Sequence, residues 1–307
     1  MDKTKPGQTL SGRPIAKRIV AKMKLHWQRK VVNIKNVIAG HTMAEELQKT
    51  VLGQKLEGFH PAHAAYVYAQ NQVSVMSEQL TALKEMAPFV DIISKAEDLY
   101  VPSAPPMSPL TTSYFTCWAF FDACEGPANE TIGTVVLDVG SAFGMHPELL
   151  RLVQLMQDSR MGFYIHRGGE GDASVLEDLV TGAEYRTIVP AGYKGQKNEN
   201  WYVRLLPPFP GGKEHVAFTT PYIVVHPDFG EWLAYFRRTF PATAGFADYE
   251  RHLKYGPTRG YWNDFVFEAY VNHQADAIYL AGLPDIPESR PHSEVSQVNG
   301  WKGIIGR

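Results

Sequence analysis

The chain has 307 residues, and its 44% hydrophobic and 12% aromatic content excludes an intrinsically disordered protein. Its two cysteines, Cys117 and Cys124, are too few for a disulfide framework and match neither a redox nor a zinc spacing. No apolar run approaches the roughly 18–20 residues that span a bilayer, and the N-terminus lacks the apolar region of a secretory signal. We therefore expect a cytoplasmic protein, and we expect neither a cofactor nor a metal.

The formal net charge of −2 conceals a strong asymmetry along the chain. Residues 1–44 contain ten Lys and Arg against one acidic residue, Asp2, so they carry a formal charge of +9 and the remainder carries −11. Clustered basic charge is a sequence-level indication of an anionic partner.

This basic segment contains a predicted amphipathic helix. Pro14 suits a first helical turn, and apolar residues recur every three or four positions from Ile15 to Ile38. The basic side chains fall largely on the other face, where they are either simply solvated or contact an anionic partner. A nucleic acid is the favoured partner, with an acidic protein or an anionic membrane as alternatives. The candidate nucleic-acid-binding residues are Lys17, Arg18, Lys22, Lys24, Arg29, Lys30 and Lys35.

The next segments are predicted to be helical up to a proline-rich connector. A capping box at Thr42–Glu45 opens a helix over 43–52, and further helices are expected over 61–86 and 89–99. His60 and His63 could share a helix face, but no third ligand follows at a readable spacing, so we interpret them as capping and packing residues. Prolines within 101–109 indicate a domain boundary, and we interpret the aromatic segment 114–123 as core.

The central segment is predicted to be rich in β-strands. We expect a strand over 132–139, a helix over 147–157, and then five or six short strands between 162 and 225. Gly168-Gly169 is expected to end the first of these strands, and Thr181-Gly182 to form a hairpin turn. Their regular spacing predicts a small antiparallel barrel or a strongly bent sheet.

One stretch carries a resemblance. Val-Leu-Glu-Asp-Leu-Val-Thr-Gly-Ala-Glu-Tyr begins at Val175, and Trp-Tyr-Val-Arg-Leu-Leu-Pro-Pro begins at Trp201. Residues 175–208 resemble a β-rich segment of uncharacterised bacterial proteins. The resemblance implies a β-rich module and a bacterial origin, and it carries no known catalytic residues.

The C-terminal part offers a candidate active site. Helices are expected over 229–240 and 263–277, with a polar and aromatic loop between them. His252 or His273 could act as a general base oriented by Asp264. The alternative interpretation is an ordinary capped helix with solvated charges. Glu184-Tyr-Arg186 resembles half of a nuclease motif of the PD-(D/E)xK type, but Arg stands where that motif has Lys.

Together these features predict an α+β fold with a helical N-terminal region, a central small antiparallel β-barrel or bent sheet, and a helical C-terminal cap. The expected segments are 1–40, 41–100, 101–130, 131–226 and 227–307. The expected function is a nucleic-acid-associated or regulatory binding protein that contacts polyanions through its basic first helix, aided by Lys194 and Lys197. The alternatives are a hydrolase or nuclease-like enzyme that uses residues 249–273, and an assembly protein of a homo-oligomer with the first helix at a subunit interface.

Overall fold

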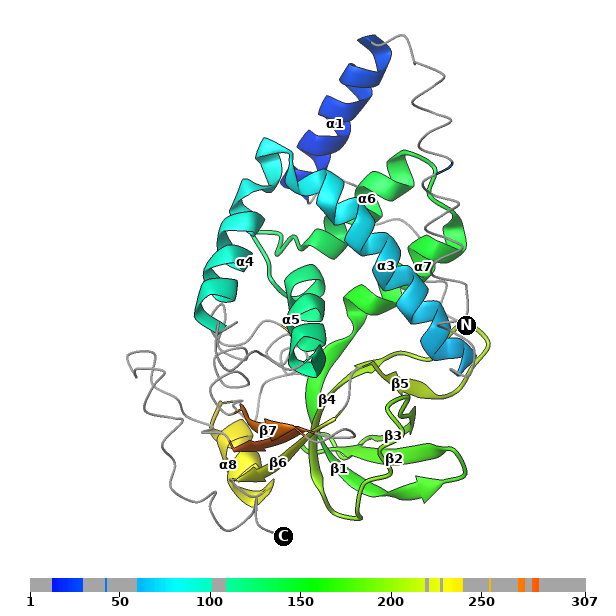
Figure 1. The fold of residues 1–307 in the computed structure, drawn as a ribbon, viewed down its shortest axis with the longest axis vertical. Coiled ribbons are helices and arrows are strands. Elements are labelled where there is room, and N and C mark those ends of the chain that lie inside the picture. Colours follow the sequence, from blue (N-terminus) through cyan, green and yellow to red (C-terminus); the bar gives the residue numbers. More distant parts are fainter. Residues whose placement is uncertain are drawn as a thin grey trace. The chain divides into compact units, whose positions relative to one another are not determined.

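A computed structural model describes residues 13–29, 42, 60–100, 109–218, 221–226, 229–239, 254, 270–273 and 278–281 (Figure 1). The chain forms two compact units. The first, the helical unit, comprises Met1–Lys95 and Thr116–Asp158, and the second, the barrel unit, comprises Ala96–Phe115 and Ser159–Arg307. The five segments expected from the sequence stay a prediction.

The helical unit is built from helices that pack on a shared apolar core. Helix α1 packs on α6 and on the short 3-10 helix η2, while α3 packs on α6 and α7. Two further helices, α4 (Ala87–Tyr100) and α5 (Pro109–Phe121), each lie partly in both units. The bounds of the others are α1 Pro14–Arg29, α3 Pro61–Thr81, η2 Lys84–Met86, α6 Ile132–Ala142 and α7 Pro147–Asp158.

Helix α6 corrects the strand that the sequence predicted over 132–139. Thr131 caps the helix, because its hydroxyl accepts from the backbone N–H of Thr134 while the Thr134 hydroxyl accepts from the N–H of Thr131. Nearly every residue of α6 is buried. A short apolar run buried on all sides has no period that separates helix from strand, and here the capping box determines the outcome.

Most other helix predictions are confirmed. The helix expected over 61–86 is α3 followed by η2, and those expected over 89–99, 147–157 and 229–240 are α4, α7 and α8 (Phe229–Thr239). The aromatic segment 114–123 contains buried core residues, including Tyr114 and Phe121. The extension of the first helix past Arg29 and the helix expected over 43–52 lie outside the described residues, apart from Thr42.

The barrel unit contains a closed five-stranded barrel, as the sequence predicted. The strands close in the order β1–β2–β3–β5–β4, with β4 pairing back to β1, and β6, β8 and β7 extend the sheet from β4. Most pairings are antiparallel, but β3–β5 and β6–β8 are parallel. The strands are β1 Arg160–Glu170, β2 Ala173–Asp178, β3 Glu184–Ile188, β4 Asn200–Leu206, β5 His215–Ala217, β6 Tyr222–His226, β7 Tyr270–His273 and β8 Ile278–Ala281.

Strands β1, β2 and β4 are largely buried on both faces, whereas β3 is mostly exposed. This burial explains why the sequence of the buried strands alternates only imperfectly. Trp201 lies opposite Tyr164 and points into the barrel core with Leu176. On the other face, Phe163 stacks on Trp232 of α8 with ring centroids 4.4 Å apart. Strand β4 is buried along its whole length. A strand covered on both sides needs apolar residues at successive positions.

Two local predictions in this unit are wrong. Strand β1 does not end at Gly168-Gly169; it continues to Glu170 with a register shift between His166 and Gly168, whose φ is 121°. The glycine pair follows this β-bulge within the strand, and the chain turns at Gly171 instead. The helix expected over 263–277 is contradicted at Tyr270–His273, which form β7 and pair with β8. Pairing of β8 with β6 provides the edge on which β7 adds.

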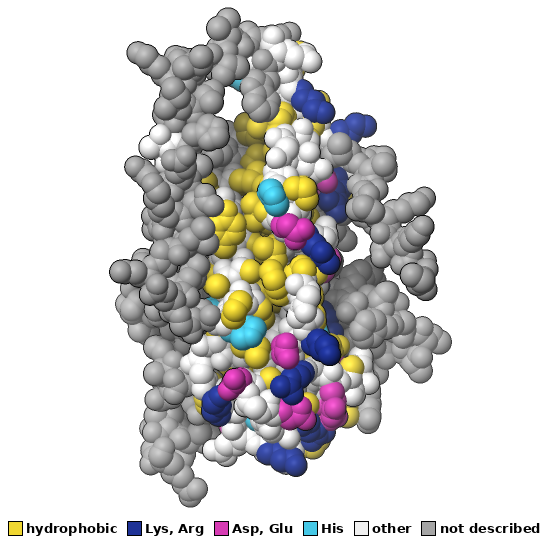
Figure 2. All heavy atoms as spheres, turned by 90° about the vertical axis from the view of Figure 1, so that its right-hand side faces the viewer, with side chains coloured by type: hydrophobic (Ala, Val, Ile, Leu, Met, Phe, Trp, Pro, Cys, Tyr) yellow, Lys and Arg dark blue, Asp and Glu magenta, His cyan; other side chains and the backbone are white. Residues whose placement is uncertain are grey.

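The outer surface of the barrel carries ion pairs between neighbouring strands. Arg167 contacts Glu177 at 2.6 and 3.0 Å, and Arg186 contacts Glu170 at 2.6 Å. Basic and acidic side chains are accordingly interleaved in the lower part of Figure 2. Arg186 is the last residue of the nuclease-like half-motif Glu184-Tyr-Arg186. Its ion pair with Glu170 places this half-motif among the ion pairs of the barrel surface.

Candidate functional site

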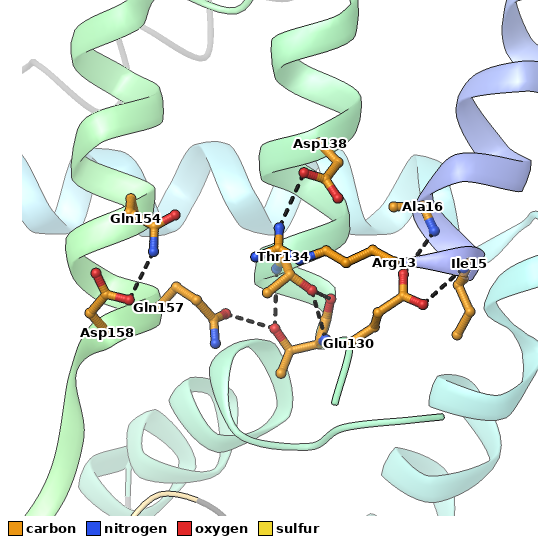
Figure 3. A network of polar contacts seen from close by, with 10 residues as sticks. Arg13, Ile15, Ala16, Glu130, Thr134, Asp138, Gln154, Gln157 and Asp158 are labelled. Carbon is orange, nitrogen blue, oxygen red and sulfur yellow. Dashed lines mark hydrogen bonds and ion pairs between the residues drawn. The ribbon is translucent and has the colours of Figure 1, made fainter. Parts of the chain in front are cut away.

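The first helix is fixed at its N-terminus by a buried carboxylate from a distant part of the chain (Figure 3). Glu130, which is 0% exposed, accepts hydrogen bonds from the backbone N–H groups of Ile15 and Ala16, each at 2.9 Å. These N–H groups have no partner within the helix, and a negative charge is favourable at a helix N-terminus. Arg13 adds an ion pair to Asp138 at 3.1 Å. The helix is therefore anchored to the helical unit.

A second set of hydrogen bonds supports this anchor. The Thr131 hydroxyl donates to the Gln157 side-chain oxygen at 2.7 Å, and the Gln157 amide donates to the carbonyl of Phe121 at 2.9 Å. Burial raises the pKa of Asp138, and the nearby Arg13 guanidinium opposes this rise. The buried polar groups around Glu130 thus serve the structure of the helical unit.

The exposed face of α1 carries the candidate nucleic-acid-binding residues. Ile15, Ile19 and their neighbours Ala16 and Val20 are buried, as the predicted stripe required. Leu25 is 49% exposed on the opposite face. The basic residues on that face that the structure describes as exposed are Lys17, Arg18, Lys22 and Lys24. Nothing is described of the Arg29 side chain, and Lys30 and Lys35 lie outside the described residues.

One acidic residue of the helical unit contacts this basic face. The Lys22 ammonium group lies 3.1 Å from a Glu85 carboxylate oxygen. Two hydrogen bonds lower the pKa of Glu85: the larger contribution comes from the Glu85 backbone and the next from the Lys22 side chain. Such a solvent-exposed pair contributes little free energy, so it leaves Lys22 available to a stronger anionic partner.

The predicted catalytic residues are not brought together by the described structure. His252 and Asp264 lie outside the described residues, and of His273 only the backbone is described, in β7. The one described residue of the loop, Lys254, donates to the carbonyl of Ser159 at 2.8 Å. The active-site hypothesis for 249–273 therefore stays a prediction.

A pocket at one mouth of the barrel was not predicted. It has a volume of about 240 Å³ and is bounded by inward-facing side chains, by the β1–β2 turn and by the loop that precedes β4. The lining residues are His166, Gly168, Gly169, Gly171, Asp172, Ala173, Ser174, Val189, Tyr193, Lys194, Gly195 and Lys197. In the sequence, His166 lies inside strand β1 and nothing distinguishes it from a core residue. Its position at the barrel mouth becomes evident only once the barrel is closed.

His166 is a buried polar side chain of this pocket, as is Ser174. The His166 side chain is 2% exposed and its ring stacks on Trp201, with centroids 4.7 Å apart. Its Nδ1 lies 3.1 Å from the carbonyl oxygen of Gln196, which can only accept, so the hydrogen resides on Nδ1. Its Nε2 is buried and has no hydrogen-bond partner among the residues that the structure describes. Burial lowers the pKa of His166, opposed by the Gln196 carbonyl and by Glu199.

The loop on the other side of the pocket is held in place by Glu199. Its carboxylate accepts hydrogen bonds from the Tyr193 hydroxyl and from the Trp201 indole N–H, both at 2.9 Å. The backbone of His166 also exchanges hydrogen bonds with this loop, donating to Glu199 and accepting from Asn198. The pocket wall is thus built in advance of any ligand.

Comparison of the chain with family models, with curated proteins and with solved structures found no match. The described residues contain no group of three or more His, Cys, Asp or Glu side chains placed to hold a metal ion. In the same part of the chain, no helix combines the length and apolarity needed to cross a membrane.

Proposed function

We propose that the protein is a cytoplasmic nucleic-acid-associated or regulatory binding protein, which contacts phosphates through the exposed basic face of α1. The observation that carries this proposal is the position of Lys17, Lys22 and Lys24. They are exposed on a helix whose opposite face is buried and whose first turn is fixed by Glu130. A helix that is already anchored loses little conformational entropy when it binds.

The spacing of the charges suits a polyanion better than a single small ion. From Lys17 to Lys24 the helix rises by about 10 Å. Duplex DNA presents one negative charge per roughly 1.7 Å of its axis, so several phosphates lie within that length. Basic side chains that neutralise phosphates release condensed counterions, which favours binding at low salt. An acidic protein offers no such regular line of charges.

Two further features are compatible with this proposal. Glu85 is a weak internal competitor for Lys22, because the ion pair is exposed to solvent. Cys117 and Cys124 are both buried and are not joined in a disulfide, as expected in the reducing cytoplasm.

Retention on immobilised heparin and on duplex DNA across a salt gradient tests the proposal. Deletion of α1 would remove Ile15 and Ile19 from the core, so surface substitutions are the sharper test. One variant carries Lys17→Gln, Lys22→Gln and Lys24→Gln. The matched control makes the same charge change at exposed residues that belong neither to α1 nor to the loop that precedes β4, namely Lys95→Gln, Arg151→Gln and Lys213→Gln.

We expect the α1 variant to elute from both matrices at much lower salt and the control to elute close to the wild type. Circular dichroism would verify that both variants fold. Equal loss in both variants would overturn the proposal, because retention would then follow net charge rather than α1. Unchanged retention of the α1 variant, accompanied by a change in oligomeric mass, would also overturn it and favour the assembly alternative.

A further inference from the structure

We propose that the pocket at the barrel mouth binds a small anion that carries a hydroxyl hydrogen, namely inorganic hydrogen phosphate. In this site Lys194 and Lys197 supply positive charge, and Nε2 of His166 accepts the hydrogen bond from the ligand. The site is independent of α1, since all its residues belong to the barrel unit.

The pocket has the position and size of a site for a small ligand. The mouth of a β-barrel is a common binding location, because inward-facing side chains and loops converge there. A volume of about 240 Å³ lies below the roughly 300–1,000 Å³ of sites for drug-sized ligands. The pocket therefore fits a compact ionic group better than a large apolar molecule.

The unpartnered nitrogen of His166 indicates that the site is incomplete without a ligand. Buried polar atoms are almost always hydrogen-bonded, and an orphaned one has a free-energy cost. The Gln196 carbonyl fixes the hydrogen of the neutral imidazole on Nδ1, so Nε2 can only accept. A ligand that completes this hydrogen bond must itself donate one.

The charges around the pocket favour an anion. Lys194 and Lys197 are exposed on the loop that forms one wall, and Asp172 on the β1–β2 turn opposes them with one negative charge. The lining glycines, including Gly168 and Gly171, leave their backbone open to a ligand because they carry no side chain. Among the residues that line the pocket the balance is one net positive charge, and Glu199, which also acts on His166, is not part of the lining.

These requirements distinguish phosphate from sulfate. Inorganic phosphate loses its last hydrogen only in strongly alkaline solution, so at neutral pH it still carries at least one, whereas a phosphate monoester, whose second pKa is about 6, is mostly a dianion without any. Sulfate has the same shape and charge but no hydrogen to donate. Nε2 of His166 should therefore accept from phosphate and repel sulfate, and this preference should shrink as falling pH protonates the imidazole. The charged groups that face His166 are Glu199, Asp172, Lys194 and Lys197.

Titration of full-length protein labelled with ¹⁵N-histidine, followed by NMR, tests the site. The probes are inorganic phosphate and sulfate at constant ionic strength and pH 7.5. The His166→Asn variant assigns the resonance and retains an amide donor for the Gln196 carbonyl while lacking Nε2. A Lys194→Gln, Lys197→Gln variant removes the charge, and Lys213→Gln, whose residue does not line the pocket, is the control.

We expect saturable shifts of the His166 Nε2 resonance with phosphate, and at least about tenfold weaker binding of sulfate, which corresponds to the loss of one good hydrogen bond. The double lysine variant should bind phosphate at least about tenfold more weakly, whereas Lys213→Gln should bind as the wild type does. Equal affinities for sulfate and phosphate, or no saturable shift of His166 with phosphate, would overturn the proposal. The triple α1 variant should keep phosphate binding, so failure of one proposal is distinguishable from failure of the other.

Discussion

Glu130 in the helical unit and His166 in the barrel unit differ in how completely their hydrogen bonds are satisfied. Around Glu130, the carboxylate, the Thr131 hydroxyl and the Gln157 amide all have partners within hydrogen-bonding distance. His166 is also buried, but its Nε2 has no hydrogen-bond partner among the described residues and lies beside a pocket. A completed network stabilises a fold, whereas an incomplete one at a cavity indicates a ligand site.

The exposed lysines of the two units are also arranged differently. On α1 the lysines follow a straight helix and face solvent, which suits an extended polyanion. At the barrel mouth Lys194 and Lys197 border a small enclosed volume, which suits a single anionic group. Similar side chains thus predict two different partners because their supporting structures differ.

The largest expected effect comes from removing the anchor of α1. Glu130→Ala should lower the free energy of unfolding of the helical unit by about 4 kcal/mol, because two buried N–H groups lose their acceptor at about 1–3 kcal/mol each. Urea denaturation followed by circular dichroism would measure it. Glu78→Ala on the exposed surface of α3, far from the N-terminus of that helix, is the control, expected within about 0.5 kcal/mol of wild type. A cost below about 1 kcal/mol for Glu130→Ala would mean that the network does not anchor α1.

A somewhat smaller effect should follow from acidification. Burial, with repulsion by His60, lowers the pKa of His63 in α3 from 6.5 to about 4. The unfolded chain therefore binds a proton at a higher pH than the folded chain, so stability should be full above pH 6.5 and fall between pH 6.5 and 4, by up to about 3 kcal/mol. His63→Gln should flatten this part of the stability–pH profile. An identical profile in the variant would contradict the prediction.

In the barrel unit, the contribution of a buried carboxylate to stability can be tested at Asp178, as it can at Glu130 in the helical unit. Its Oδ1 accepts from the N–H groups of Val180 and Thr181 at 2.9 Å, and its Oδ2 lies 3.4 Å from the Arg160 guanidinium. Asp178→Asn keeps the turn acceptor but removes the negative charge beside the buried Arg160 guanidinium, so thermal or urea unfolding should show a loss of about 2 kcal/mol. The exposed Glu184→Gln serves as control. Equal stability of the two variants would argue against a structural role for the pair.

The smallest expected effect comes from Glu85, the acidic residue that pairs with Lys22 on the basic face of α1. Glu85→Gln should change stability by less than about 1 kcal/mol, since the Lys22–Glu85 pair is exposed. It should nevertheless strengthen DNA binding measurably, because Lys22 no longer has an internal anion. Weaker DNA binding in this variant would show that Glu85 positions Lys22 rather than competing for it.

Local patterns in the sequence predicted much of the fold, but long-range contacts determined the sites. The apolar spacing of Ile15 and Ile19 predicted α1, and turn residues such as Gly182 predicted the hairpins of the barrel. No local pattern connects Glu130 to the first turn of α1, because 115 residues separate it from Ile15. Strand alternation likewise could not indicate the parallel β3–β5 pairing that closes the barrel.

The errors have physical causes as well. Ile132 to Val139 is apolar at almost every position, so only the capping box at Thr131 separates helix from strand. Gly168 was interpreted as a strand end, although its positive φ accommodates a bulge within β1. That interpretation ended the first strand one residue after His166 and hid the pocket that the bulge helps to form.

The central claim, that α1 contacts phosphates, is tested most directly by the salt dependence of the DNA-binding constant. Fluorescence anisotropy would measure binding of wild type and of the Lys17→Gln, Lys22→Gln, Lys24→Gln variant to one duplex over a range of salt concentrations. Each lost phosphate contact should reduce the slope of log K against log salt by about 0.9, so the variant should lose between about 2 and 3. Equal slopes for the two proteins would contradict the account, because the lysines of α1 would then displace no counterions.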